Sequence, residues 1–115
     1  MFANLHRQAN YVGGNEMLFM VIETFRNQDA KAVYRRFRDH GRMLPDGVTF
    51  VGSWVAADLG RCFQLMQAAD VTLLQRWVAE WSDLIEFEIV PVVASADTRA
   101  VIEPLLEGGG EAQST

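Results

Sequence analysis

The amino-acid sequence predicts an α+β fold in which a four-stranded antiparallel sheet carries two helices on one face. Two observations predict this fold. The order strand, helix, strand occurs twice in succession between Met17 and Val93, with few polar residues between the elements. In addition, a turn of only three residues, Asp58-Leu59-Gly60, joins the end of the first unit to the start of the second. Such a short connection is typical of a β-hairpin.

The first unit begins with the strand Met17–Phe25 (MLFMVIETF), which is apolar at odd and even positions alike. Such a strand is typically buried on both faces. Asp29 is expected to cap a helix, because apolar residues recur after it at helical spacing. These residues are Ala30, Val33, Tyr34, Phe37, Gly41 and Leu44. Gly41 and Pro45 predict the end of the helix, and Val48–Ala56 is the second predicted strand.

The second unit begins with the strand Arg61–Ala68, and Asp70 is expected to cap the helix that follows. The inner face of that helix is predicted to carry Leu73, Leu74, Trp77, Val78 and Trp81. Ile85–Val93 is the fourth strand, and Pro91 predicts an edge position for it, where a missing N–H donor costs least. With right-handed crossovers the two βαβ units give the strand order 4-1-3-2 of a ferredoxin-like sandwich.

The domain is expected to cover residues 17–106. Met1–Glu16 is polar and has neither helical nor strand periodicity, which predicts a flexible N-terminal extension and makes Met17 a candidate start. Ala96–Leu106 predicts a short terminal helix. Glu107–Thr115 contains three consecutive glycines and no apolar residue larger than alanine, so it is expected to be a disordered tail.

Strand parity predicts which side chains share a face of the sheet. The face expected under the helices carries Leu18, Met20, Ile22, Val51, Val55, Phe63, Leu65, Phe87 and Ile89. The other face is expected to carry Phe19, Val21, Glu23, Phe50, Gly52, Trp54, Cys62, Gln64, Met66, Glu86, Glu88 and Val90. Because large exposed apolar patches are rare on monomers, this second face predicts a homodimer with a barrel-like interior. A bulge in any strand would exchange the two faces.

Composition narrows the classes of partner. The net charge of −5 and the pI near 4.9 argue against a nucleic-acid or anionic-membrane partner, which would require a basic surface. The single cysteine, Cys62, excludes an internal disulfide and favours a cytoplasmic location. With only His6 and His40 in the chain, a metal site built on histidine is not expected, and neither is a cofactor.

The predicted strand order brings several polar side chains to one end of the open face. Glu23, Trp54, Cys62 and Glu86 would meet there, with Gln64 and Glu88 nearer the middle. Paired carboxylates in a half-dry pocket raise each other's pKa, so Glu23, Glu86 and Glu88 are candidate acid/base groups. The alternative is that Glu86 and Glu88 lie on a solvated rim or pair with arginine across a dimer interface.

The remaining candidate site residues each have two interpretations. Trp54 is the tryptophan expected to form a pocket wall, with Gln64 beside it. Cys62 is a thiolate nucleophile only if a base or a helix N-terminus lowers its pKa, and otherwise it is a small core residue. Arg42 and Asp46, in the loop GRMLPDG, either mark the rim of a binding site or belong to a helix stop and turn.

Four segments, MLFMVIETFRN, YRRFRDHGRMLPDGVTFVGSWV, CFQLM and LLQRWVAEWSDLIEFEIVPV, resemble the DUF3303 family of small bacterial proteins of unknown function. The resemblance covers about residues 17–93. It implies a ferredoxin-like fold within the broad group of dimeric α/β barrels, which includes cofactor-independent oxygenases, haem-degrading enzymes and dehydratases. No catalytic residues are established for the family, so the resemblance assigns none here.

These observations predict a small homodimeric domain that binds a small organic ligand between its sheet and the partner sheet. One alternative is a cofactor-independent enzyme of the barrel group in which a glutamate acts as acid or base. A further alternative is a structural or regulatory dimer without a ligand. A cavity lined by Trp54, Gln64 and the glutamates favours the first two, whereas a dry, filled interface favours the third.

Overall fold

The computed structural model describes the backbone of residues 16–112 and the side chains of residues 16–107. The elements follow in the order β1 (Met17–Phe25), η1 (Arg26–Gln28), α2 (Ala30–His40), β2 (Thr49–Val55), β3 (Arg61–Ala68), α3 (Val71–Trp81), β4 (Ile85–Val92) and α4 (Ser95–Ala112). The expectations for residues 1–15 and 113–115 lie outside the described residues.

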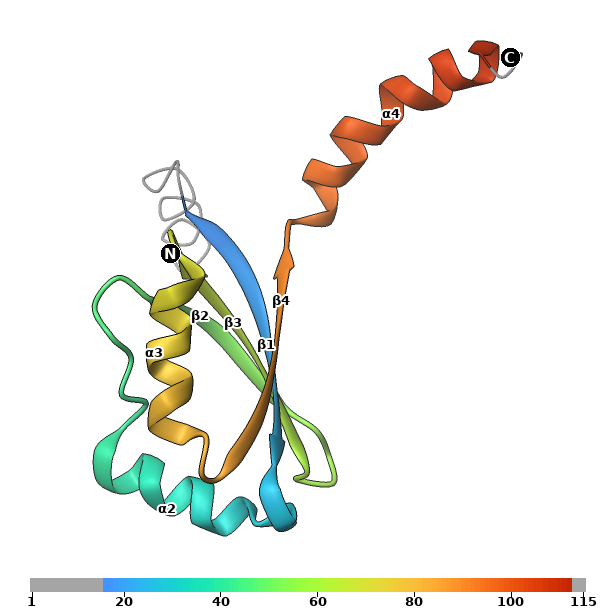
Figure 1. Cartoon of the computed structure of the whole chain (residues 1–115). Helices are drawn as coiled ribbons and strands as arrows, with labels where there is room; N and C mark the ends of the chain where they lie inside the picture. The colour runs from blue at the N-terminus through green and yellow to red at the C-terminus, as the bar shows by residue number, and fades with distance from the viewer. Residues whose placement is uncertain (1–15, 113–115) are drawn as a thin grey trace, which may run out of the picture.

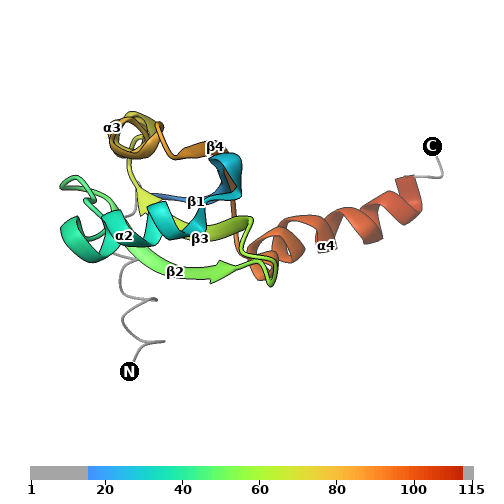
Figure 2. The same ribbon diagram turned by 90° about the horizontal axis from the view of Figure 1, so that it is seen from below.

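The four strands form one antiparallel sheet in the order β2-β3-β1-β4, which is the predicted order read from the other edge. Helices α2 and α3 lie on the same side of the curved sheet (Figures 1 and 2). The predicted α+β, ferredoxin-like fold is therefore confirmed. Pro91 lies in β4, which is an edge strand as expected.

Side-chain caps begin both covering helices, as predicted. The backbone N–H of Ala32 donates to Oδ1 of Asp29 over 3.1 Å, and that of Thr72 donates to Oδ1 of Asp70 over 2.9 Å. Helix α2 ends at Gly41, whose φ of 71° favours glycine.

The sheet faces are exchanged relative to the prediction for β1 and β3. Glu23 lies directly opposite Cys62 on β3 and Phe87 on β4, and all three face the helices. The neighbouring Ile22 pairs with Phe63 and is only half-buried on the open face. Because β1 is apolar at both parities, alternation alone could not decide which set faces the helices.

A bulge in β2 puts Phe50 and Trp54 on opposite faces of the sheet, although alternation along the strand predicts one face for both. Phe50 pairs with Met66, which faces the helices. The register shifts between Phe50 and Gly52, so that Trp54 pairs with Phe63 on the open face. The interior between helices and sheet is therefore built from one set of side chains, and the open face carries a second apolar set.

Helix α4 leaves the domain at the end of β4 and points away from the sheet (Figure 1). It is longer than the predicted Ala96–Leu106, since its backbone remains helical through Ala112. Within residues 16–112, no helix has both the length and the apolarity that crossing a bilayer requires.

Candidate functional site

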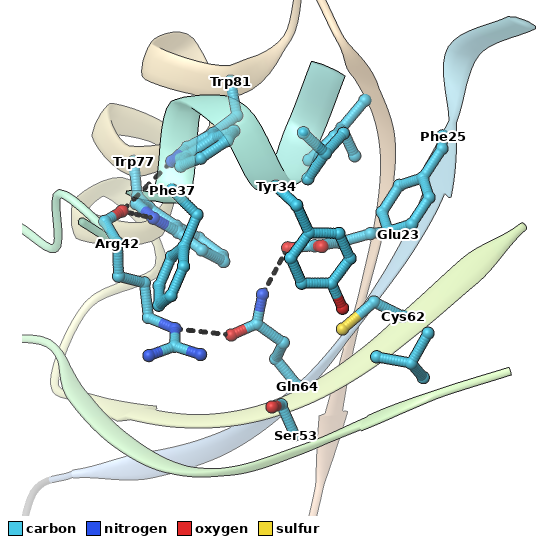
Figure 3. A pocket seen from close by; sticks show the side chains of 13 residues that line it. Glu23, Phe25, Tyr34, Phe37, Arg42, Ser53, Cys62, Gln64, Trp77 and Trp81 are labelled. Carbon is cyan, nitrogen blue, oxygen red and sulfur yellow. Dashed lines mark hydrogen bonds between the residues drawn. The ribbon is translucent and has the colours of Figure 1, made fainter. Parts of the chain in front are cut away.

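A pocket of about 130 Å³ lies between α2, α3 and the helix-covered face of the sheet (Figure 3). Its wall is largely aromatic and aliphatic: Phe25, Val33, Tyr34, Phe37, Val55, Trp77, Trp81 and Ile85. Its polar side chains are Glu23, Arg42, Ser53, Cys62 and Gln64. The pocket is thus an apolar chamber with a few polar groups, as ligand sites in proteins usually are.

Glu23, in the C-terminal half of β1, is the buried carboxyl group of this pocket and is 3% exposed. Its Oε2 accepts a hydrogen bond of 2.6 Å from Nε2 of Gln64. Within the described part of the chain, Oε1 has no hydrogen-bond partner. Burial raises the pKa of Glu23 from 4.5 to about 7, against the lowering effects of the Gln64 hydrogen bond and the Arg42 charge.

Gln64 links Glu23 to Arg42. Its Oε1 accepts a hydrogen bond of 3.0 Å from Nε of Arg42, while its Nε2 donates to Glu23. An arginine has only donors, so the amide oxygen of Gln64 must face Arg42 and the amide nitrogen must face Glu23. This arrangement leaves Oε1 of Glu23 as the oxygen available to carry or accept a proton.

Arg42 is held at both its backbone and its side chain. Its carbonyl oxygen accepts hydrogen bonds from the indole nitrogens of Trp77, at 2.9 Å, and Trp81, at 3.1 Å. Its guanidinium lies over the ring of Phe50 at 3.9 Å and over that of Phe37 at 5.2 Å. Two tryptophans of α3 therefore fix the loop that brings the cation to the pocket.

Cys62 and Tyr34 lie beside Glu23 in the pocket (Figure 3). Burial, followed by the Glu23 charge, raises the pKa of Cys62 to about 11. Burial is also the first cause that raises the pKa of Tyr34, with the Cys62 and Glu23 charges adding to it. The Cys62 thiol therefore stays protonated at neutral pH, which favours the small core residue over the nucleophile.

Four of the predicted site residues share this pocket, namely Glu23, Cys62, Gln64 and Arg42. Three others do not. Trp54 is 56% exposed and lies on the open face, opposite Phe63. Glu86 and Glu88 are exposed on that same face, and Glu86 forms a 3.1 Å ion pair with Arg26.

The expected pair of carboxylates in one pocket was therefore wrong. The partner of Glu23 in β4 is Phe87, and Glu86 lies opposite Thr24, one position away. Since successive side chains of a strand point to opposite faces, this offset places Glu86 and Glu88 across the sheet from Glu23. The raised pKa of Glu23 comes first from burial and not from a second carboxylate.

Sequence reasoning missed Tyr34, Phe37, Ser53, Trp77 and Trp81 as pocket residues. Four of them had been assigned to the buried faces of the two helices, and the pocket lies within that layer. One signal was available in the sequence. A buried tryptophan N–H needs an acceptor, so Trp77 and Trp81, one helical turn apart, indicated a nearby polar group.

In the described ranges of the chain, no group of three or more His, Cys, Asp or Glu side chains could hold a metal ion. The pocket itself contains one carboxyl group, one thiol and one guanidinium.

Comparison with protein-family models gives a match. The family model described as "Domain of unknown function (DUF3303)" matches residues 17–106. Neither the curated proteins nor the solved structures gave a match.

Proposed function

The chain belongs to the DUF3303 family, whose function is unknown, and we propose that this domain binds a small organic molecule in the pocket lined by Glu23. The ligand lies between the sheet and the helices of a single chain, and not between two sheets as the sequence had suggested.

The observation that carries this function is the buried carboxyl of Glu23. Removing a carboxylate from water is costly, and here it has one hydrogen bond and no direct ion pair among the described residues. A core residue selected only for stability would be apolar. Buried ionisable groups with strongly shifted pKa values cluster at functional sites, which supports a binding role.

Size and lining indicate the class of ligand. A volume of about 130 Å³ is close to the ~150 Å³ of an apolar cavity that holds a benzene molecule. The rings of Tyr34, Phe37 and Trp77 offer flat apolar contacts. Because Oε1 of Glu23 accepts a hydrogen bond when ionised, the fitting ligand is a small planar molecule with one hydroxyl or N–H donor.

Phenol is the probe that tests this function. At pH 8 we expect phenol to bind wild-type protein more tightly than toluene, which has the same shape and no donor. In the Glu23→Gln variant this preference should fall about tenfold, since a hydrogen bond to an ionised group stabilises by ~1.5–3 kcal/mol and a neutral one by ~1 kcal/mol. Amide chemical shifts recorded during NMR titration give both affinities.

Glu88→Gln is the matched control, because it makes the same change on the open face and should leave both affinities unchanged. Saturable phenol binding that is equal in wild type and Glu23→Gln contradicts the role of Glu23. Absence of any saturable phenol binding contradicts the pocket's role and favours the structural dimer without a ligand.

A second candidate function is proton transfer without a cofactor. A pKa of about 7 lets Glu23 exchange a proton near neutral pH, which is the condition for efficient general acid or base catalysis. In this role Gln64 holds Oε2, and Oε1 takes a proton from, or returns it to, an acidic O–H or C–H of the substrate. Conversion of the bound molecule distinguishes this function from simple binding.

A homodimer formed through the helix-free face remains part of the proposed function, although β1 and β3 contribute other side chains to that face than the sequence predicted. The face that is free of helices carries Leu18, Met20, Ile22, Trp54, Phe63, Leu65 and Val90. It is apolar enough to favour association.

A further inference from the structure

Helix α4 carries an apolar stripe that is exposed to solvent in the described part of the chain. The stripe consists of Val101, Ile102, Leu105 and Leu106, which are between 41% and 66% exposed. Their spacing at positions 1, 2, 5 and 6 puts all four on one side of the helix, as in helices that pack against another surface. The helix projects away from the sheet in both views (Figures 1 and 2).

The sequence of α4 does not favour a helix that stands alone in water. Pro104 lies inside it, where it removes a backbone hydrogen bond and costs ~3 kcal/mol. Residues 108–110 are glycines, and each costs ~1 kcal/mol relative to alanine in a helix. Isolated helices of this length are marginal even with favourable sequences. The helix therefore requires a surface on which its apolar stripe is buried.

The open face of the sheet is a complementary surface. Leu65, Met20 and Val90 form a continuous apolar row across three strands, since Met20 pairs with both of the others. The row ends on β2 at Gly52, which pairs with Leu65 and lacks a side chain. Trp54 stands beside it with more than half of its surface exposed.

Helix α4 does not lie on the open face of its own chain (Figures 1 and 2). Only Val93 and Ala94 separate the end of β4 from the start of α4. The carbonyl of Ala94 already accepts hydrogen bonds from the N–H groups of Asp97 and Thr98, at 2.9 and 3.3 Å. Across this short link α4 leaves the domain and points away from the sheet (Figure 1).

We propose that α4 of each chain packs against the open sheet face of a second copy, so that two chains exchange their C-terminal helices. One chain carries both surfaces, and a two-fold symmetric pair buries both stripes and both faces. Arg99 borders the apolar stripe. Glu88 on the open face has no ion-pair partner within residues 16–107, so the exchange offers it one.

Three substitutions in the full-length chain test this exchange. Leu105→Glu charges the stripe of α4, and Trp54→Glu charges the open face at a position exposed enough to leave the fold intact. Ala100→Glu is the matched control, because Ala100 lies on the opposite side of α4. By sedimentation velocity at micromolar concentration we expect the mass of two chains for wild type and Ala100→Glu, and of one chain for the other two variants.

Mixing the two monomeric variants gives the decisive result. Leu105→Glu has an intact face and Trp54→Glu has an intact helix, so the 1:1 mixture can form one correct contact. We expect a sedimenting species with the mass of two chains in this mixture. Leu65→Glu serves as a second face variant, and dispersed NMR spectra verify that each variant is folded.

Every other outcome contradicts the exchange. If Leu105→Glu remains dimeric while the two face variants become monomeric, the open faces pair directly with each other. If both face variants remain dimeric, the α4 helices pair with each other. A mixture that stays monomeric excludes contact between helix and face, and a monomeric wild type shows that no second copy covers this surface.

Discussion

Replacing Trp77 by alanine is expected to remove a large share of the folding stability of the domain. The side chain is 1% exposed, packs edge to face on Phe87 with ring centres 5.6 Å apart, and donates its N–H to the carbonyl of Arg42. Truncating a buried aromatic side chain to alanine costs ~3–5 kcal/mol. Since small domains have total stabilities of ~5–15 kcal/mol, this is a large share of the whole.

Trp77→Phe is the matched comparison for this prediction. Phenylalanine keeps an apolar ring at the site but loses the N–H donor, while the Arg42 carbonyl still accepts from Trp81. The expected loss is ~1–2 kcal/mol, the usual range for one hydrogen bond and a small change in packing. Urea unfolding at neutral pH measures both variants. Equal losses in the two variants would show that the buried ring is not what holds α3 to the sheet.

Replacing Glu23 by glutamine is expected to stabilise the protein above pH 7 by about 3 kcal/mol, because ~1.4 kcal/mol corresponds to each pKa unit. The pKa of Glu23 is about 7 in the folded protein, raised from 4.5 by burial. Between these two values the folded state holds a proton that the unfolded state has lost. Stability therefore falls as pH rises through this window, and the full loss is reached above pH 7. Glutamine has the same shape and no such titration.

The measurement for Glu23→Gln is the free energy of unfolding from pH 4 to pH 9. The difference between variant and wild type should be small at pH 4 and should grow to its full size above pH 7. Glu88→Gln, on the exposed open face, should show no comparable gain. A Glu23→Gln variant that is less stable than wild type at pH 8 would contradict the prediction that the ionised Glu23 side chain destabilises the folded state.

Most of the fold could be predicted from the sequence because local signals agreed with one another. Asp29 and Asp70 cap the helices as expected, and the strands β1 and β3 have the predicted bounds. The assignment of sheet faces failed for a physical reason. β1 is apolar at both parities, so its pattern carries no information on which face meets the helices.

The candidate site could be predicted only in part. Glu23, Cys62 and Gln64 share one face because they occupy directly paired or alternating positions of β1 and β3, and strand order together with alternation along each strand already grouped them. Trp54 lies on the open face as predicted, but not with Glu23, because the bulge in β2 and the exchanged faces of β1 and β3 are not visible in the sequence pattern. The anchoring of Arg42 by two tryptophans depends on loop geometry, which single-sequence patterns do not encode.

Carbon-detected NMR titration of the Glu23 side-chain carboxyl, in wild type and in Gln64→Leu, tests directly whether this carboxyl is buried on the pocket wall. A buried carboxyl on the pocket wall should titrate with a midpoint near pH 7. In Gln64→Leu the midpoint should be higher, because the hydrogen bond from Gln64 stabilises the ionised form. A midpoint near 4.5 in both proteins would show that Glu23 is solvated and would contradict the buried carboxyl on which the ligand pocket depends.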